Sequence, residues 1–196
     1  MFIGLGTSTA GIQKTGGGGP TSNPNVVGTS NDGNYPTGIE SGDLVIVFAT
    51  KDTPFSIPMG FTSLTSGNNG GNYYHIASLT AAGSESGSIG ITALSVGCLV
   101  TRNQASSTIV TMVNNGSSWA MLTGLNTNSM IVAAGYSSDG SGNHGGETIP
   151  EGFTTFESSG TVILAVKDEP EAGTGYSYDG FVNSGSVAMC YSIGIG

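Results

Sequence analysis

Two histidines and a nearby carboxylate are the residues of this chain best suited to acid–base or metal chemistry. His75 lies in the segment YYHIA, whose pattern is typical of a strand, and this context favours a packed or surface histidine over a general base. His144 and Glu147 lie in the glycine-rich segment GSGNHGGE, where the two side chains could share a metal ion. A metal site in a protein needs more than two such ligands. We therefore expect no metal site here and no catalytic role for either histidine.

The sequence also gives no strong indication of a catalytic nucleophile or of a phosphate-binding loop. Cys98 and Cys190 each lie inside an apolar strand, where a free cysteine behaves as a small buried hydrophobic residue. Serines stand between glycines in GSESGS and GYSSDG, but neither segment has the strand–turn–helix context of a nucleophile elbow. The segment KDEPE at 167–171 lacks the alternating ligands of a calcium loop, and the glycine run at 16–19 lacks the Lys-Ser/Thr ending of a phosphate loop. We expect no cofactor, and a protein that is not an enzyme.

The charge of the chain limits its partners. The formal net charge is −9, and the basic residues are Lys14, Lys51, Arg102 and Lys167. Because the chain has so few cations, we expect it to bind neither nucleic acid nor an anionic membrane surface. No segment approaches the roughly eighteen apolar residues of a membrane span, and the opening residues lack the basic leader and apolar core of a signal peptide.

The elements that must position these residues are predicted to be strands. The chain has 196 residues, of which 34 are glycine and only 9% are charged, and these values suit an all-β protein with many turns. Short apolar or alternating runs separated by turn residues predict the following strands: 43–50, 61–66, 72–78, 89–100, 107–113, 118–123, 129–136, 153–158, 161–167 and 186–194. The continuous apolar runs LVIVFA and MIVAAG predict strands that are covered on both faces.

One phrase occurs twice in the chain, as SIPMGFTSLTS at 56–66 and TIPEGFTTFES at 148–158. In each copy a proline at the second position and a glycine at the fourth position predict a type I turn, over Ile57–Gly60 and Ile149–Gly152. The flanking segments correspond as well, so that Cys98 and Cys190 occupy nearly equivalent places. The period of about ninety residues exceeds the twenty to fifty of repeat arrays, and the chain therefore reads as two similar halves of one domain.

These observations predict a β-sandwich, jelly-roll-like in type, with an extended N-terminal arm. The sandwich is expected over 38–196, with halves at about 41–101 and 128–194. The arm is expected over 1–37, because four consecutive glycines and the nearby prolines cannot offset the entropy of ordering by their own contacts. The apolar anchors of the arm are expected to dock on a neighbouring subunit or on a shell beneath, and they are Met1, Phe2, Ile3, Leu5, Val26 and Val27.

The order GDLVIVFATKD, SIPMGFTSL, NYYHIA, GSESGS and SVGCLV, followed by NSMIVAAGY, TIPEGFTTF and VILAVKD, resembles a family of β-sandwich domains found in virion proteins of tailed bacteriophages. The resemblance covers Gly42 to about Ile193, with Phe61 and Phe153 where tryptophan is frequent in that family. It rests on a Gly-Asp motif before an apolar strand and on a P-x-G-[FW]-T turn. Because these motifs are structural, the resemblance implies a fold and no active site.

Two functions stay open from the sequence. The resemblance implies a structural protein of the virion, a capsid decoration or cement protein that binds other virion proteins, forms homo-oligomers and stabilises the particle after assembly in the host cytoplasm. The alternative is a receptor-binding or carbohydrate-binding module of a tail fibre or tail tip, for which Trp119, Tyr73 and Tyr74 could supply stacking surfaces. A third interpretation is an enzyme such as a glycoside hydrolase, but the sequence has no recognisable pair of catalytic carboxylates.

Overall fold

The protein is described from a computed structural model, which defines residues 24–69, 71–93, 95–104, 110–114, 130–137, 153–159, 162–168 and 188–195. Every regular element in these residues is a β-strand, and they contain no helix. The expected all-β class is therefore confirmed. The strand expected at 118–123 and the segment 1–23 lie outside the described residues.

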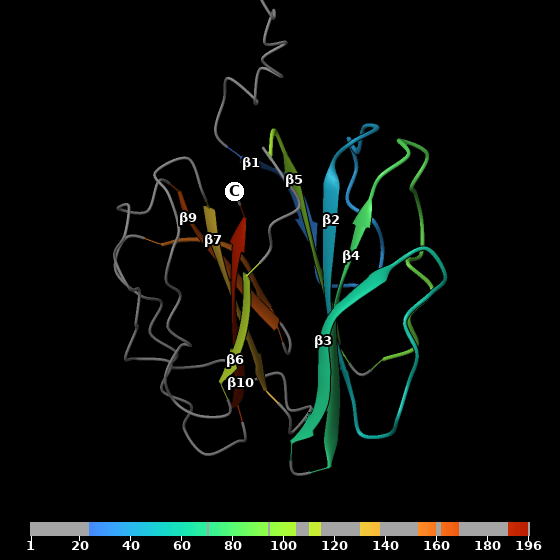
Figure 1. Cartoon of the computed structure of the whole chain (residues 1–196), viewed down its shortest axis with the longest axis vertical. Helices are drawn as coiled ribbons and strands as arrows, with labels where there is room; N and C mark the ends of the chain where they lie inside the picture. Colours follow the sequence, from blue (N-terminus) through green and yellow to red (C-terminus); the bar gives the residue numbers. More distant parts are fainter. Residues whose placement is uncertain are drawn as a thin grey trace, which may run out of the picture.

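Ten strands form two antiparallel sheets of five strands each (Figure 1). The first sheet has the order β1-β5-β2-β4-β3 and the second has the order β6-β10-β7-β9-β8. The strands of the first sheet are β1 (Asn25–Ser30), β2 (Leu44–Lys51), β3 (Thr62–Asn69), β4 (Asn72–Thr80) and β5 (Ser95–Arg102). The strands of the second are β6 (Val110–Asn114), β7 (Met130–Ser137), β8 (Thr154–Ser159), β9 (Val162–Asp168) and β10 (Ala188–Ile195).

The two sheets repeat the same strand order, because each strand of the first sheet has its counterpart five strands later in the chain. The repetition extends to an irregularity of the ladder. The register between β3 and β4 shifts between Ser63 and Thr65, and the register between β8 and β9 shifts between Thr155 and Glu157. A bulge inserts one extra residue into one strand of a pair, and here that residue is Leu64 in one half and Phe156 in the other. The duplicated phrase therefore marks a duplicated strand, bulge included.

Strand β2 runs through the middle of the first sheet and is buried on both faces. All residues from Leu44 to Thr50 are buried. On one face, Val45 and Val47 pack with the side chains of β5 and with loop residues such as Phe55. On the other face, Ile46 and Phe48 are 0% and 3% exposed. The central strand β7 of the second sheet begins in the same way, with buried residues from Met130 to Val132. The prediction of doubly covered strands is thus confirmed for LVIVFA and for the first three residues of MIVAAG.

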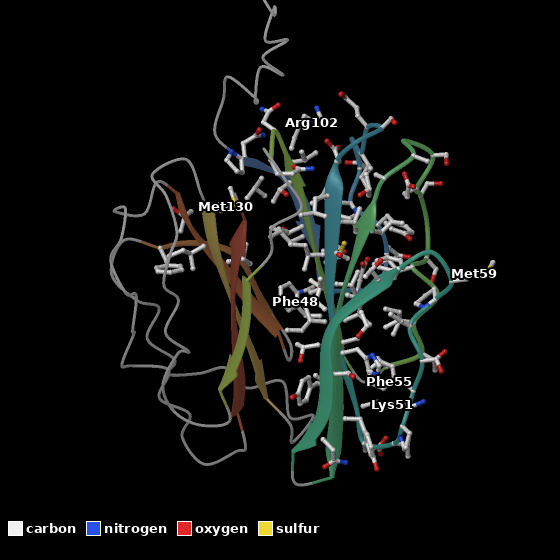
Figure 2. All side chains as sticks on the ribbon, viewed as in Figure 1. Phe48, Lys51, Phe55, Met59, Arg102 and Met130 are labelled. Carbon is white, nitrogen blue, oxygen red and sulfur yellow. The ribbon has the colours of Figure 1, made fainter. Side chains whose placement is uncertain are left out.

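The two faces of β2 are covered by different parts of the chain. Figure 2 shows Phe48 on the side of β2 toward the second sheet and Phe55 on the opposite side. Strand β5 contacts β9, and β1 contacts β8. Loop residues of the first half, among them Tyr35, Ile39 and Phe55, pack on the other face of the first sheet. One face of β2 is thus covered by loop residues of the first half, and its opposite face is buried as well, which accounts for the continuous apolar pattern.

Part of the segment expected as an N-terminal arm pairs with the first sheet. Residues Asn25–Ser30 form β1, which pairs with β5 from Arg102 to Cys98 and belongs to the first sheet. The segment that follows is also integrated, since the Tyr35 amide donates to the Gly87 carbonyl and the Ile89 amide donates to the Gly33 carbonyl. Val26 and Val27 favour a strand, and the edge of β5 offers this strand backbone partners. Together these two effects outweigh the tendency of the nearby glycines and prolines to prevent regular structure.

Two further details differ from the sequence prediction. Strand β5 begins at Ser95, whereas a strand was expected from residue 89; Ile89 and Ile91 pack on the core from a loop instead. The Phe61 amide donates to the Pro58 carbonyl at 3.4 Å, which places Gly60 at the third turn position with φ +99°. A positive φ at that position defines a type II turn, which lies one residue later than the expected type I turn. The counterpart turn at 149–152 lies outside the described residues.

Candidate functional site

A charged cluster closes the end of the first sheet at the Gly-Asp motif. The Asp43 side chain is 2% exposed and accepts two hydrogen bonds from Arg102, from Nε at 2.7 Å and from a terminal nitrogen at 2.8 Å. The Glu40 amide also donates to the Asp43 carboxylate, at 2.8 Å. Arg102 further donates to the Gly38 carbonyl and forms an ion pair with Glu40 at 3.0 Å. The guanidinium of Arg102 holds the pKa of Asp43 below its usual range.

We call Asp43, Arg102 and Glu40 the clamp. Backbone hydrogen bonds of Asp43 and its neighbour add to these side-chain contacts. The Ala81 amide donates to the Asp43 carbonyl at 2.8 Å, and the Gly42 amide donates to the Ala81 carbonyl at 2.9 Å. The clamp therefore joins the loop before β2 both to the end of β5 and to the residue after β4. A buried carboxylate needs partners of this kind. Sequence reasoning assigned no role to Asp43 or Arg102, although the Gly-Asp motif was the available signal.

A hollow of about 470 Å³ lies beside the clamp, at the same end of the sheet. Its lining residues are Leu44, Gly60, Thr62, Leu64, Ser78, Leu79 and Thr80. Leu44 pairs with Thr80, and Thr62 pairs with Ser78, so these four side chains share one face of three adjacent strands. The bulge residue Leu64 also lines the hollow. The hollow thus combines leucine side chains with three hydroxyl groups, and its lining contains no charged residue.

His75 is held in the loop-covered face of the first sheet and makes no catalytic pair in the described residues. It lies opposite Ala49 on β2 and opposite Ser66 on β3, and its ring is tilted against Phe55 with centroids 4.8 Å apart. The Nδ1 atom is buried and has no hydrogen-bond partner in the structure. Burial lowers the pKa of His75 from its ordinary value, so the imidazole is neutral at pH 7. This geometry agrees with a packed histidine.

The cysteines lie in different sheets. Cys98 is fully buried opposite Val47 and is a free thiol, and burial raises its pKa to about 12. Such a thiol carries almost no thiolate at neutral pH and is a poor nucleophile. Cys190 lies on β10 opposite Gly135. By strand register the counterpart of Cys98 is Ser192, so the two cysteines are two residues out of step.

The serine and acidic segments are used in turns. In GSESGS the Glu85 carboxylate accepts hydrogen bonds from the Ala82 and Gly83 amides at 2.8 Å, and these backbone bonds lower its pKa. The Ser88 hydroxyl accepts from the Gly90 amide at 3.1 Å. In the acidic segment, Lys167 and Asp168 end β9, and the rest of that segment lies outside the described residues. Ser88 and Glu85 therefore shape the loop that packs on the core.

The two tyrosines expected to offer a stacking surface point to opposite faces of β4. Tyr73 pairs with Lys51 and Tyr74 pairs with Thr50, and neighbouring residues of a strand alternate between faces. The Tyr74 ring lies over Gly67 on β3, where a Cβ atom would collide with it. One platform built from both rings is excluded. Trp119, His144 and Glu147 lie outside the described residues, and within those residues no three His, Cys, Asp or Glu side chains gather as metal ligands.

Comparison with known proteins adds no relative. No protein-family model, no curated protein and no solved structure matches the chain. Within the described residues there is no helix of the length and apolar character that a membrane crossing requires. The clamp, the hollow and the duplicated sheets are therefore the features on which a function can be argued.

Proposed function

We propose that the chain is a structural protein of a tailed-bacteriophage virion, and that it serves as a capsid decoration or cement protein that binds the particle surface and stabilises it. One observation supports the proposal: both motifs on which the phage resemblance rests have a structural role in this protein. Asp43 of the Gly-Asp motif is the centre of the clamp, and the Pro-Gly turn positions the start of β3. Both motifs act within a scaffold, as that resemblance implies, and neither supplies a reactive group.

We further propose that the two sheets pack face to face as a β-sandwich. Ile46, Phe48 and Leu99 are buried on the face of the first sheet that its own loops leave uncovered, and β5 contacts β9 of the second sheet. Two packed sheets with apolar inner faces form such a core. Because each half of the chain completes its own sheet, the strand order favours a sandwich of two like sheets over a jelly-roll connectivity, in which each sheet would draw strands from both halves.

The proposed partners are other virion proteins and further copies of this chain. A net charge of −9 with only four basic residues disfavours nucleic acid and anionic membranes as partners. The segment 1–23 contains Met1, Phe2, Ile3 and Leu5, whose burial on a neighbour would offset the ordering of a glycine-rich stretch. The proposed role requires no enzyme activity, no metal and no cofactor.

The alternative is a receptor-binding or carbohydrate-binding module of a tail fibre or tail tip. The hollow favours it in one respect, because the hydroxyls of Thr62, Ser78 and Thr80 can exchange hydrogen bonds with a neutral sugar. The opposed orientation of Tyr73 and Tyr74 counts against it, since sugars bind well on a shared aromatic face. The decoration role is therefore the better supported of the two.

The test is to purify phage particles that carry an affinity-tagged copy of the chain and to locate the tag by gold labelling and electron microscopy. The decoration role predicts many regularly spaced copies on the head, and it predicts that particles assembled without the chain release DNA at a lower temperature. A few copies confined to the tail would favour the receptor-binding alternative. Absence of the chain from washed particles would contradict both roles.

A further inference from the structure

The loop between β2 and β3 is held on the first sheet by side-chain packing. Phe55 and Phe61 pack against apolar residues of β2 and β5, whereas Met59 at the tip of the loop is fully exposed (Figure 2). Within the described residues, no hydrogen bond joins residues 52–60 to the rest of the chain. The one bond of the loop runs from the Phe61 amide to the Pro58 carbonyl. A segment with so few attachments can open without unfolding the sheet.

The aromatic ring that attaches this loop rests on a histidine. The centroids of Phe55 and His75 are 4.8 Å apart, and their planes are tilted by 59°. The Nδ1 atom of His75 is buried and has no hydrogen-bond partner. A protonated imidazole carries an N–H group at both ring nitrogens, and a buried donor without a partner is costly. The closed loop therefore suits the neutral imidazole and opposes the charged one.

The groups around His75 do not stabilise a cation there. By strand register the same face carries Lys51 on β2 and Tyr73 on β4, and Asp52 in the loop is exposed. The residue opposite His75 on β3 is Ser66, which is neutral. Among the described residues no carboxylate pairs with the imidazole, and the ammonium group of Lys51 lies on the same face. Protonation of His75 would thus place a second positive charge on this face.

We propose that protonation of His75 releases residues 52–60 from the first sheet, so that this loop is a lid that opens in mildly acidic solution. In the open form water can hydrate both ring nitrogens. Burial lowers the pKa of His75 in the closed form, and exposure returns it toward its ordinary value of 6.5. The open form therefore binds the proton more tightly, and opening becomes more favourable as the pH falls below 6.5. This device goes beyond the proposed virion role and does not depend on it.

The lid belongs to the first half of the chain. Register places Ile163 at the position of His75 in the second half, and an isoleucine cannot take up a proton. When the lid opens, Phe55 leaves the sheet and joins Met59 as an exposed apolar side chain. Mildly acidic solution therefore gives the first half an apolar surface that it lacks at neutral pH.

The experiment is limited proteolysis of the full chain at pH 7.5 and pH 5.5. Thermolysin cuts before large apolar residues such as Phe55 and Ile57, and its rate on a native protein reports the population of the open form. Dividing by the rate on a free peptide of residues 50–62 removes the pH dependence of the protease. We expect this ratio to be at least threefold higher at pH 5.5. Cleavage within β5 should stay unchanged, which separates opening of the lid from global unfolding.

The first variant is His75→Ile, whose ratio should be the same at both pH values. An unchanged ratio in the wild type, or an equal acceleration in His75→Ile, would overturn the proposal. Acceleration of cuts in β5 and in the loop by the same factor would also contradict it, because the whole sheet would then be opening.

A second variant supplies the partner that the protonated histidine lacks. Ser66→Asp places a carboxylate directly opposite His75, where cross-strand side chains meet, and should reduce the acid acceleration to less than twofold. Ser63→Asp is the matched control, because it adds the same charge to the same strand opposite Ala77 and should keep the threefold effect. Equal ratios for the two variants would show that net charge sets the opening, and the assignment to His75 would then be wrong.

Discussion

The two halves of the chain build the same sheet from different residues. The strand order and the bulge are repeated, yet the clamp occurs in the first half alone. Ser129 precedes β7 where Asp43 precedes β2. By register, Leu44 pairs with Thr101 and Met130 pairs with Ile195, which places Gly196 at the position of Arg102. Serine and glycine cannot form an ion pair.

The comparison distinguishes the features that the sheet requires, which both halves share, from features that occur in one half. The features shared by both halves are backbone pairing, a bulge and an apolar central strand, and these define the sheet. By sequence, the residues of the clamp and the exposed methionine of the first half have no identical counterparts in the second half. Exchanging residues between corresponding positions therefore tests which of these features stabilise the protein and which serve contacts with a partner.

The largest effect is expected from removing β1, the counterpart of β6. Deletion of residues 1–37 exposes the edge of β5 and removes Val27 and Tyr35 from the core. We expect it to lower the free energy of unfolding by about 3 kcal/mol or more, because it removes two partly buried apolar side chains together with the whole β1–β5 ladder, whereas one fully buried aliphatic side chain contributes roughly 1.5–3 kcal/mol. Deletion of residues 1–23 leaves β1 in place and should keep the wild-type urea midpoint. Equal midpoints for the two deletions would show that β1 adds nothing to the first sheet.

The next effect concerns the clamp. Asp43→Ser introduces the residue of the second half and leaves Arg102 without its main partner. Breaking a buried ion pair by removing one member costs about 3–5 kcal/mol, and the partial exposure of Arg102 places the expected loss near the lower limit. Glu40→Ala is the matched control, because the Glu40 side chain is 70% exposed; its loss should stay below about 1 kcal/mol. Similar unfolding free energies for the two variants would contradict a stabilising clamp.

A third exchange replaces Cys98 by serine, the residue that register places at the corresponding position, Ser192. Cys98 is 0% exposed among aliphatic neighbours, so the new hydroxyl would be buried without an assured partner. This costs about 1–3 kcal/mol in urea unfolding. Cys98→Ala should cost less than Cys98→Ser, because it adds no polar group. A Cys98→Ser protein as stable as the wild type would show that the site can satisfy a buried hydroxyl.

The sequence predicted the features that depend on local pattern. The apolar run from Leu44 to Ala49 indicated a doubly buried strand, and the repeated phrase indicated two similar halves. Strand β1 was missed because NVVGTS is short and has glycines and prolines around it, and only the open edge of β5 makes it a strand. The type II turn was missed because the φ of Gly60 depends on how β3 begins.

The candidate site was less predictable, because it depends on pairing between distant segments. Asp43 and Arg102 are 59 residues apart, and their contact follows only from the position of β5 beside β2. The hollow requires the register of three strands and the bulge at Leu64. By contrast, the assignment of His75 as a packed residue needed only its strand context, and the structure places it against Phe55.

The smallest expected effect is a pH dependence that His75 gives to the first half. Register places Ile163 at the corresponding position of the second half, because His75 lies opposite Ser66 and Ile163 lies opposite Ser158. Burial lowers the pKa of His75 in the folded protein, so the unfolded chain binds the proton more tightly. Stability should therefore fall as the pH drops below the ordinary histidine value of 6.5 and should level off below the folded pKa.

Asp43 gives a dependence of the same direction in a separate range, because its lowered pKa makes stability fall only as the pH drops below its ordinary value of 3.8. Urea midpoints of the wild type and of His75→Ile, measured between pH 7.5 and pH 5, therefore isolate the histidine. The wild-type midpoint should decline over this range, and the variant should decline less. Parallel curves for the two proteins would show that His75 can reach water when protonated, and that the loop containing Phe55 does not hold the imidazole in its neutral form.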